Sequence, residues 1–168
     1  SDAVVDQFRI AQLRSQTEIE QLRQTGRRQL ATASAEPQAA LARAVFADAS
    51  AMALISVAAR QVDLARQPDG AREIAKSLIA ANYTWSEKQF TCLDQLWTKE
   101  SHWNYKARNK VSGAHGIAQA LPATKMEVVG TDWRTNPVTQ ITWGLKYIKE
   151  RYNTPCAAWS KFKRSNWY

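Results

Sequence analysis

Helical periodicity in the first 66 residues most constrains the fold of this chain. Six apolar residues fall within about 100° of one another at helical spacing, which predicts one long helix over residues 2–33; they are Val4, Val5, Phe8, Ile19, Leu22 and Leu30. Ala35-Glu36-Pro37 breaks this helix, and Pro37 suits the first turn of a second helix that runs to about Arg66. Two such helices in succession predict an antiparallel helical hairpin.

Three more helices are predicted after the hairpin. Gln67-Pro68-Asp69-Gly70 predicts a turn, and a third helix is expected over about residues 71–81. Asn136-Pro137 predicts the start of a later helix, because Asn is a good cap and Pro suits the first helical position. Strand signals are weak throughout, so the predicted fold class is all-α.

The start of the helix over residues 87–101 is marked most specifically. Ser86 and Gln89 have the spacing of a capping box, in which each side chain bonds to the other's backbone. Trp85 and Phe90 have the spacing of a hydrophobic staple across the same helix end.

Charge and tryptophan divide the chain into two parts. Residues 1–70 carry eight arginines and eight acidic residues, so the net charge of +8 lies entirely in residues 71–168. All seven tryptophans lie there too. We therefore expect a helical hairpin over 1–70, with packing, spacing or protein binding as its candidate roles, and a separate domain over 71–168. A basic, tryptophan-rich domain suits an anionic polymer, either nucleic acid or cell-wall glycan, although excess lysine also serves solubility alone.

Several function classes lack support in the sequence. No nucleic-acid-binding motif is present, and the two Cys and two His lack metal-ligand spacing, so no nucleic acid, metal or cofactor is expected. The most apolar stretch, residues 44–59, contains Asp48 and is short for a membrane span, so we expect a buried helix there and no span. Composition alone leaves the cysteines equally consistent with a disulfide and with two buried free thiols.

Glu100 is the first candidate for chemistry. It shares one face of the predicted 87–101 helix with Leu93, Leu96 and Trp97, and it lies in the last turn. Desolvation and the negative end of the helix dipole both raise the pKa of such a carboxyl group. A carboxyl group that stays protonated near neutral pH suits a general acid for glycosidic cleavage, whereas helix periodicity alone favours a glutamate at the edge of the face that reaches water.

The segments that follow Glu100 carry a family resemblance. They read Glu100-Ser101-His102-Trp103-Asn104-Tyr105, then Ser112-Gly113-Ala114-His115-Gly116-Ile117-Ala118-Gln119, then Gln140-Ile141 and Gly144-Leu145-Lys146-Tyr147-Ile148. Together they resemble the soluble-type lytic transglycosylase domain of the goose-lysozyme-like superfamily, over about residues 72–168. The resemblance is strongest to the compact type on actinobacterial cell-surface proteins, including aggregation-promoting-factor-like ones. In that type a Cys before the Glu-Ser motif and a Pro-Cys near the end match Cys92 and Pro155-Cys156, which implies a disulfide between Cys92 and Cys156.

The resemblance also implies site residues. Glu100 matches the catalytic acid/base, and Ser112, Gly116 and Gln119 match the segment that lines the cleft. Tyr147 matches the tyrosine of the family's Gly-x-x-Tyr helix. Three of these residues have a structural alternative: a turn for Gly116, a solvated amide for Gln119 and a core aromatic for Tyr147.

One motif departs from the family pattern. Where many members have Ala-Tyr-Asn, this chain reads Ala157-Ala158-Trp159-Ser160. Trp159 is therefore a candidate for stacking on a sugar or for closing the core.

The implied reaction is cleavage of peptidoglycan between N-acetylmuramic acid and N-acetylglucosamine, with 1,6-anhydromuramyl products. Residues 101–126 contain no Asp or Glu, whereas goose-type lysozymes usually carry their helper carboxylates in this interval. The absence favours the route with a single carboxylate that the resemblance implies. Asp94, Glu127 and Asp132 remain candidates for a second carboxylate, which would make the protein a hydrolytic muramidase. A non-catalytic wall-binding or surface protein is the other alternative. Each of these functions implies a bacterial protein that is secreted or associated with the cell wall.

Overall fold

The computed structural model of the chain describes residues 2–32 and 36–168. Within these ranges the regular structure is helical and no strand forms, although isolated β-bridges join His115 to Arg108 and to Ala120. The predicted all-α class is confirmed. The described chain divides into two compact units, residues 2–61 and residues 62–168.

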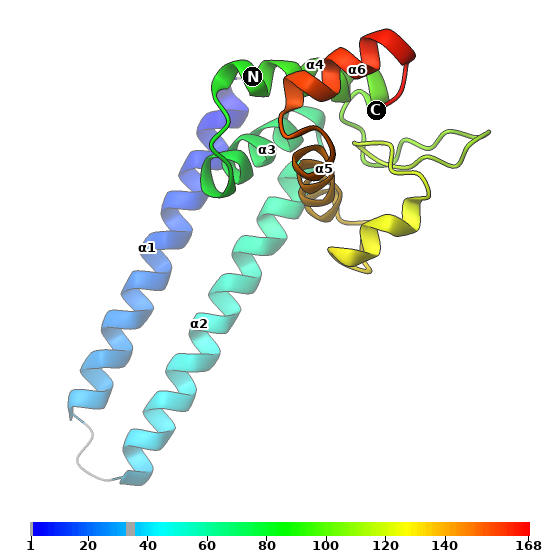
Figure 1. Cartoon of the computed structure of the whole chain (residues 1–168). Coiled ribbons are helices and arrows are strands. Elements are labelled where there is room, and N and C mark those ends of the chain that lie inside the picture. Colours follow the sequence, from blue (N-terminus) through cyan, green and yellow to red (C-terminus); the bar gives the residue numbers. More distant parts are fainter. Residues whose placement is uncertain (1, 33–35) are drawn as a thin grey trace. The chain divides into compact units, whose positions relative to one another are not determined.

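The first unit is a pair of long antiparallel helices, as predicted. It consists of α1 (Asp2–Thr32) and all but the last residues of α2 (Glu36–Ala65), which run side by side (Figure 1). Arg60 of α2 donates a hydrogen bond of 2.7 Å to the Ser15 hydroxyl of α1. Ala35, at the predicted break, lies outside the described residues.

The expectation of a buried helix over residues 44–59 is wrong. Met52, Leu54 and Ile55 are exposed, whereas the smaller Ala49 and Ala53 are half-buried. By length and composition alone, residues 37–65 of α2 could cross a membrane, with a mean hydropathy of 1.6 over the most apolar window.

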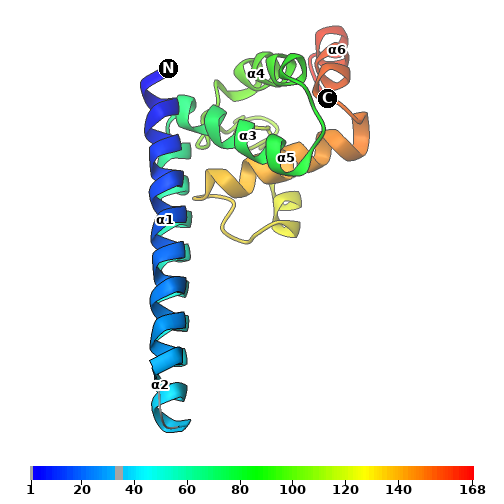
Figure 2. The same cartoon turned by 90° about the vertical axis from the view of Figure 1, so that its left-hand side faces the viewer.

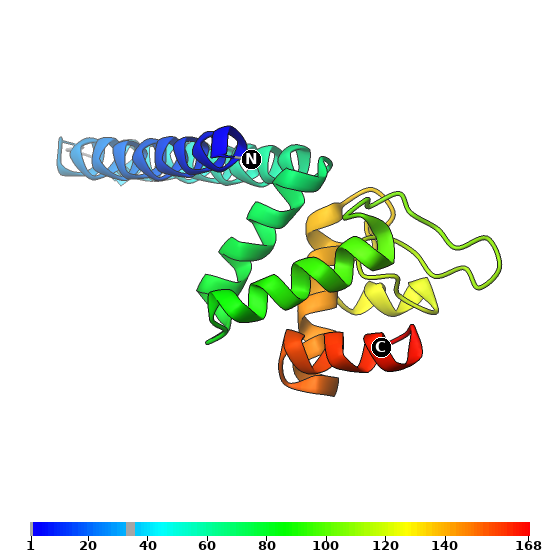
Figure 3. The same ribbon diagram turned by 90° about the horizontal axis from the view of Figure 1, so that it is seen from above.

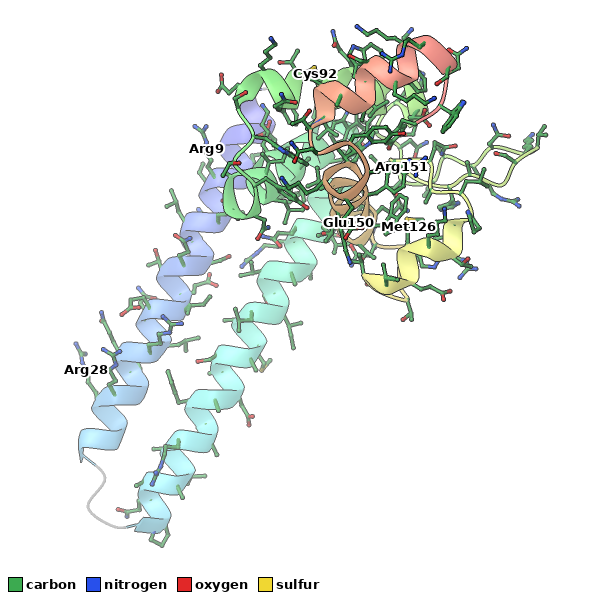
Figure 4. The ribbon with its side chains drawn as sticks, in the orientation of Figure 1. Arg9, Arg28, Cys92, Met126, Glu150 and Arg151 are labelled. Carbon is green, nitrogen blue, oxygen red and sulfur yellow. A yellow bond between two sulfur atoms is a disulfide. The ribbon has the colours of Figure 1, made fainter. Side chains whose placement is uncertain are left out.

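The second unit contains α3 (Pro68–Asn82), α4 (Glu87–Ser101), the 3-10 helix η1 (Ala123–Val128), α5 (Pro137–Tyr152) and α6 (Pro155–Ser165). Helix α4 packs on α6, α3 packs on α5, and η1 lies against α5 (Figures 2 and 3). The largest fully buried apolar side chains form the core between these elements: Trp97, Trp103, Leu93, Leu96, Ile117, Met126, Ile141, Leu145 and Ile148. Figure 4 labels Met126, the buried residue of η1.

The predicted turn over residues 67–70 is too long. The chain turns at residues 66 and 67, and Pro68 is already the first residue of α3, with Gln67 as its cap. A proline has no N–H to leave unpaired in the first helical turn and its φ suits a helix, so Pro68 begins α3.

Helix α4 begins at Glu87 as predicted, but the capping box is wrong. The Ser86 side chain makes no cap hydrogen bond, and the Gln89 side-chain oxygen instead accepts from the backbone N–H of Cys156 over 2.9 Å. Trp85 stacks on Tyr83, with ring centroids 4.2 Å apart. A contact from α6 has therefore replaced the local cap.

Helix α5 begins as predicted, because the Asn136 side chain accepts from the backbone N–H groups of Val138 and Thr139. Helix α6 was not predicted, although Thr154 caps it and Pro155 occupies its first turn. Cys92 of α4, labelled in Figure 4, forms a disulfide with Cys156 of α6. The cysteines thus join the two helices that pack together.

Candidate active site

Glu100 occupies the last turn of α4, where the chain reverses sharply. His102 and Trp103 both adopt positive φ values, 52° and 59°, and end the helix. The Trp103 side chain is fully buried, and its indole N–H donates to the Asp94 carboxylate over 2.8 Å. This buried indole fixes the reversal directly after Glu100.

Ser101 connects the end of α4 to the glycine-containing loop of residues 112–119. Its buried hydroxyl donates to the backbone oxygen of Ile117 over 2.7 Å. Glu100, which precedes Ser101, and Ala118, which follows Ile117, both line one cleft. The serine of the Glu-Ser motif therefore holds the two sides of the cleft at a fixed separation.

The cleft has a volume of about 440 Å³. It brings together four of the predicted site residues: Glu100, Ser112, Gln119 and Tyr147. These residues come from α4, from the loop between α4 and η1, and from α5. The loop, residues 102–122, extends away from the helices that carry it (Figure 1).

Burial changes the acidity of Glu100. Desolvation raises its pKa from 4.5 to about 7, because removal from water disfavours the charged form. Glu100 also has the only acidic side chain among the described residues that line the cleft. The cleft therefore holds one acidic group that can keep its proton near neutral pH.

The other candidate carboxylates lie outside this lining. Asp94 accepts from Arg72 and from Trp103, each over 2.8 Å. Asp132 accepts from Asn136 and Thr139, also at 2.8 Å, and the hydrogen bond from Asn136 is the main cause that lowers its pKa. Glu127 is an exposed residue of η1.

Gln119 lines the cleft with its backbone in a left-handed conformation, at φ 54°. Its side-chain nitrogen donates to the backbone oxygens of Gly116 and Ala107, over 2.9 and 3.2 Å. These bonds orient the amide, so its oxygen is the atom left to accept a hydrogen bond from a ligand.

Three aromatic residues form a wall of the cleft next to Glu100. Trp143 and Tyr147 stack with ring centroids 5.1 Å apart, and Tyr168 meets Tyr147 edge-on at 5.7 Å. Burial raises the pKa values of Tyr147 and Tyr168, and the Glu100 charge adds to the effect on Tyr168. Flat, partly apolar surfaces of this kind suit the faces of sugar rings.

Comparison with known families identifies the domain that holds this cleft. The model of the transglycosylase SLT domain matches residues 77–162. The chain belongs to this family. Membership supports lytic transglycosylase activity on peptidoglycan, in the extracytoplasmic space where SLT domains act. Neither the curated proteins nor the solved structures contain a match to the chain. The closer resemblance to the actinobacterial type stays a prediction.

Two predicted residues do not line the cleft of this SLT domain. Gly116 is buried with a φ of +80°, and a Cβ there would overlap the side-chain amide of Gln140. Trp159 stacks on Phe162 of α6 and lines a separate, shallower pocket with Asp94 and Lys99.

Gln140 is the main residue of the SLT domain to which sequence reasoning gave no role. Its side chain is fully buried in α5, where it accepts from the backbone N–H of Ile117 over 3.0 Å. It also donates to the backbone oxygens of Tyr105 and Trp133, over 3.0 and 2.8 Å. This one amide thereby binds the backbone at three positions, two in the loop of residues 102–122 and one in the segment between η1 and α5. The sequence signal was a glutamine beside Ile141 on the apolar side of the helix.

Other lining residues were also missed. Trp143 lies four residues before Tyr147, one helical turn away on the same face of α5, and this spacing could have identified it. Lys125, Trp167 and Tyr168 line the cleft from η1 and from the end of the described chain, where no motif marked them.

Proposed function

We propose that Glu100 cleaves the β-1,4 bond between N-acetylmuramic acid and N-acetylglucosamine in peptidoglycan, first as acid and then as base. One observation carries the proposal: Glu100, with a pKa of about 7, has the single acidic side chain among the described residues that line the cleft. The products are glycan chains with 1,6-anhydromuramyl ends.

In the first step, protonated Glu100 gives its proton to the oxygen that links the two sugars. The bond from that oxygen to the anomeric carbon of the muramyl residue breaks, and the N-acetylglucosamine side leaves with its new hydroxyl group. Positive charge develops at the anomeric carbon, and the acetamido group of the substrate stabilises it as an oxazolinium-like species. A general acid works best when its pKa lies near the operating pH, which is the condition that burial creates for Glu100.

In the second step, the Glu100 carboxylate takes the proton from the 6-hydroxyl of the same muramyl residue. The hydroxyl oxygen attacks the anomeric carbon and closes the anhydro ring, so no water is consumed. Hydrolysis by the usual inverting or retaining routes needs a second carboxylate close to the bond. None of the candidates Asp94, Glu127 and Asp132 lines the cleft, which supports the intramolecular route.

Substrate contacts follow from the lining of the cleft. We propose that the Gln119 oxygen and the Ser112 hydroxyl bind acetamido or hydroxyl groups of the glycan, and that Tyr147 supports a sugar ring from α5. Gly116 contributes indirectly, because its lack of a side chain lets the loop pack on Gln140. Trp159 lies on α6 outside the cleft, so we assign it no contact with the substrate there.

We further propose that residues 71–168 carry out catalysis and that the hairpin of α1 and α2 is a partner-binding or spacing element. We also assign the protein to the outside of the bacterial cytoplasm, as a secreted or wall-associated enzyme. The Cys92–Cys156 disulfide is consistent with that compartment, since disulfides persist where the environment is oxidising.

The test is to digest purified peptidoglycan with the protein and to measure the soluble products by mass spectrometry. Products lighter than the hydrolysed ones by one water molecule are expected, with no reducing end at the muramyl residue. Hydrated reducing ends would make the protein a muramidase. Tight binding to the sacculus without any product would instead make it a wall-binding protein.

A further inference from the structure

Lys125 is the only cationic side chain among the described residues that line the Glu100 cleft. It lies in η1, which follows the loop of residues 102–122 in the sequence, and its side chain is exposed. Glu100, the one acidic group of the lining, is largely neutral below pH 7. Below pH 7 the cleft therefore presents to a ligand one positive side chain that no charged acidic side chain of the same lining neutralises.

The backbone that carries Lys125 is fixed. The next residue, Met126, is buried in the core with 1% of its surface exposed. The Lys125 N–H donates to the backbone oxygen of Pro122 over 3.1 Å, and Val129 N–H donates to the oxygen of Met126 over 3.0 Å. An ammonium group on this anchored turn remains near the cleft, and only its own side-chain rotamers vary.

The substrate class of the proposed function offers one kind of partner for this charge. The sugar rings of peptidoglycan are neutral, and its negative charges are carboxylates on the lactyl substituent of muramic acid or on the peptide stem attached there. An ammonium group binds a carboxylate through charge-assisted hydrogen bonds and also steers its approach. Chitin, whose rings bear acetamido groups but no carboxylate, offers Lys125 only neutral acceptors, which bind an ammonium group more weakly.

We propose that Lys125 is a specificity-determining residue that binds a carboxylate of the muramyl substituent and so favours peptidoglycan over neutral glycans. The inference rests on the proposed function for its substrate class, but it concerns binding and not bond cleavage. It can therefore be tested by a measurement that does not depend on turnover.

The test measures dissociation constants through tryptophan fluorescence, because Trp143 and Trp167 line the cleft. The ligands are soluble peptidoglycan strands with their stems, strands whose stems an amidase has removed, and chitin oligosaccharides of the same length. The proteins are the wild type, Lys125→Gln, Lys125→Arg and Lys146→Gln. Lys146 is an exposed lysine of α5 that does not line the cleft, so Lys146→Gln matches the change in net charge.

Lys125→Gln is expected to raise the dissociation constant for a carboxylate-bearing strand by about 3- to 10-fold, with little change for chitin oligosaccharides. Lys125→Arg should restore most of the affinity, and Lys146→Gln should bind like the wild type. An effect confined to strands with stems assigns the carboxylate to the peptide, and an effect on stripped strands assigns it to the lactyl group. Equal weakening for all three ligands, or none for either kind of strand, would overturn the proposal. Cleavage without such an effect would overturn only this inference, whereas the effect without cleavage would overturn only the proposed function.

Discussion

The indole N–H of Trp97 donates a hydrogen bond to the hydroxyl oxygen of Tyr168 over 2.9 Å. That hydroxyl in turn donates to the backbone oxygen of Ala118 over 3.0 Å. Trp97 is fully buried and lies three residues before Glu100 on α4, while Ala118 lies in the loop that forms another part of the cleft. A single phenol therefore links the catalytic candidate's helix to the cleft loop.

Tyr168→Phe is expected to lower the free energy of unfolding by about 1–3 kcal/mol, since it leaves the buried Trp97 N–H without an acceptor. Denaturant unfolding followed by tryptophan fluorescence measures the change. Tyr83→Phe, which removes the hydroxyl of a half-buried tyrosine that stacks on Trp85, is the matched control and should cost less. Equal stability of Tyr168→Phe and the wild type would show that the bond contributes nothing.

The free energy of unfolding should fall as pH rises from about 4.5 to about 7, as a result of Glu100. An unfolded glutamate loses its proton near pH 4.5, whereas folded Glu100 keeps it until about pH 7, so the folded state binds more protons between these values. The loss should reach about 2 kcal/mol above pH 7, with allowance for partial solvent access.

Glu100→Gln removes this titration. The difference in stability between the variant and the wild type should therefore shift in favour of the variant as the pH rises through this window. Glu127→Gln, at an exposed position of η1, should keep the wild-type slope. Parallel curves for Glu100→Gln and the wild type would contradict a raised pKa at Glu100.

The disulfide between α4 and α6 should contribute strongly to stability. It closes a separation of 64 residues, for which the chain-entropy model gives about 4 kcal/mol. A reductant is expected to lower the melting temperature of the wild type but not that of a Cys92→Ala/Cys156→Ala variant. Alkylation of the denatured protein before and after reduction counts the thiols, and two free thiols before reduction would rule out the bond.

Gln140→Met should destabilise the cleft loop, because methionine fills a similar volume but bonds to no backbone group. The backbone N–H of Ile117 and the backbone oxygens of Tyr105 and Trp133 would lose their partner. A loss of about 3 kcal/mol or more is expected in denaturant unfolding, together with reduced cleavage. Gln95→Met, at an exposed site on α4, is the control, and a similar small effect for both variants would contradict this role of Gln140.

Local sequence signals correctly predicted those helix ends that are set by residues next to them in the sequence. Asn136-Pro137 begins α5 because the cap and the first helical position are set within four residues of one another. The all-α fold class and the hairpin followed from helical periodicity. Four residues that line the cleft followed from the family resemblance. Helix α6 has the same kind of start, Thr154-Pro155, but its apolar pattern was too short to distinguish it from a loop.

The remaining features depend on contacts between distant segments. The Gln89 side chain does not form the predicted capping box, because it accepts a hydrogen bond from the backbone N–H of Cys156, 67 residues later. Gln140 serves backbone groups at three positions that only the folded loop brings to it. Trp167 and Tyr168 reach the cleft through the packing of α6 on α4, which no local pattern of residues encodes.

The most direct test of the account is the rate at which Glu100→Gln releases soluble products from peptidoglycan, measured beside the wild type. The variant keeps the shape of the side chain but cannot give or take the proton, so the account predicts at least about a 100-fold loss of rate. Its circular dichroism spectrum and its affinity for soluble strands should match those of the wild type. A rate within about tenfold of the wild type in a folded, binding-competent variant would contradict Glu100 as the acid/base.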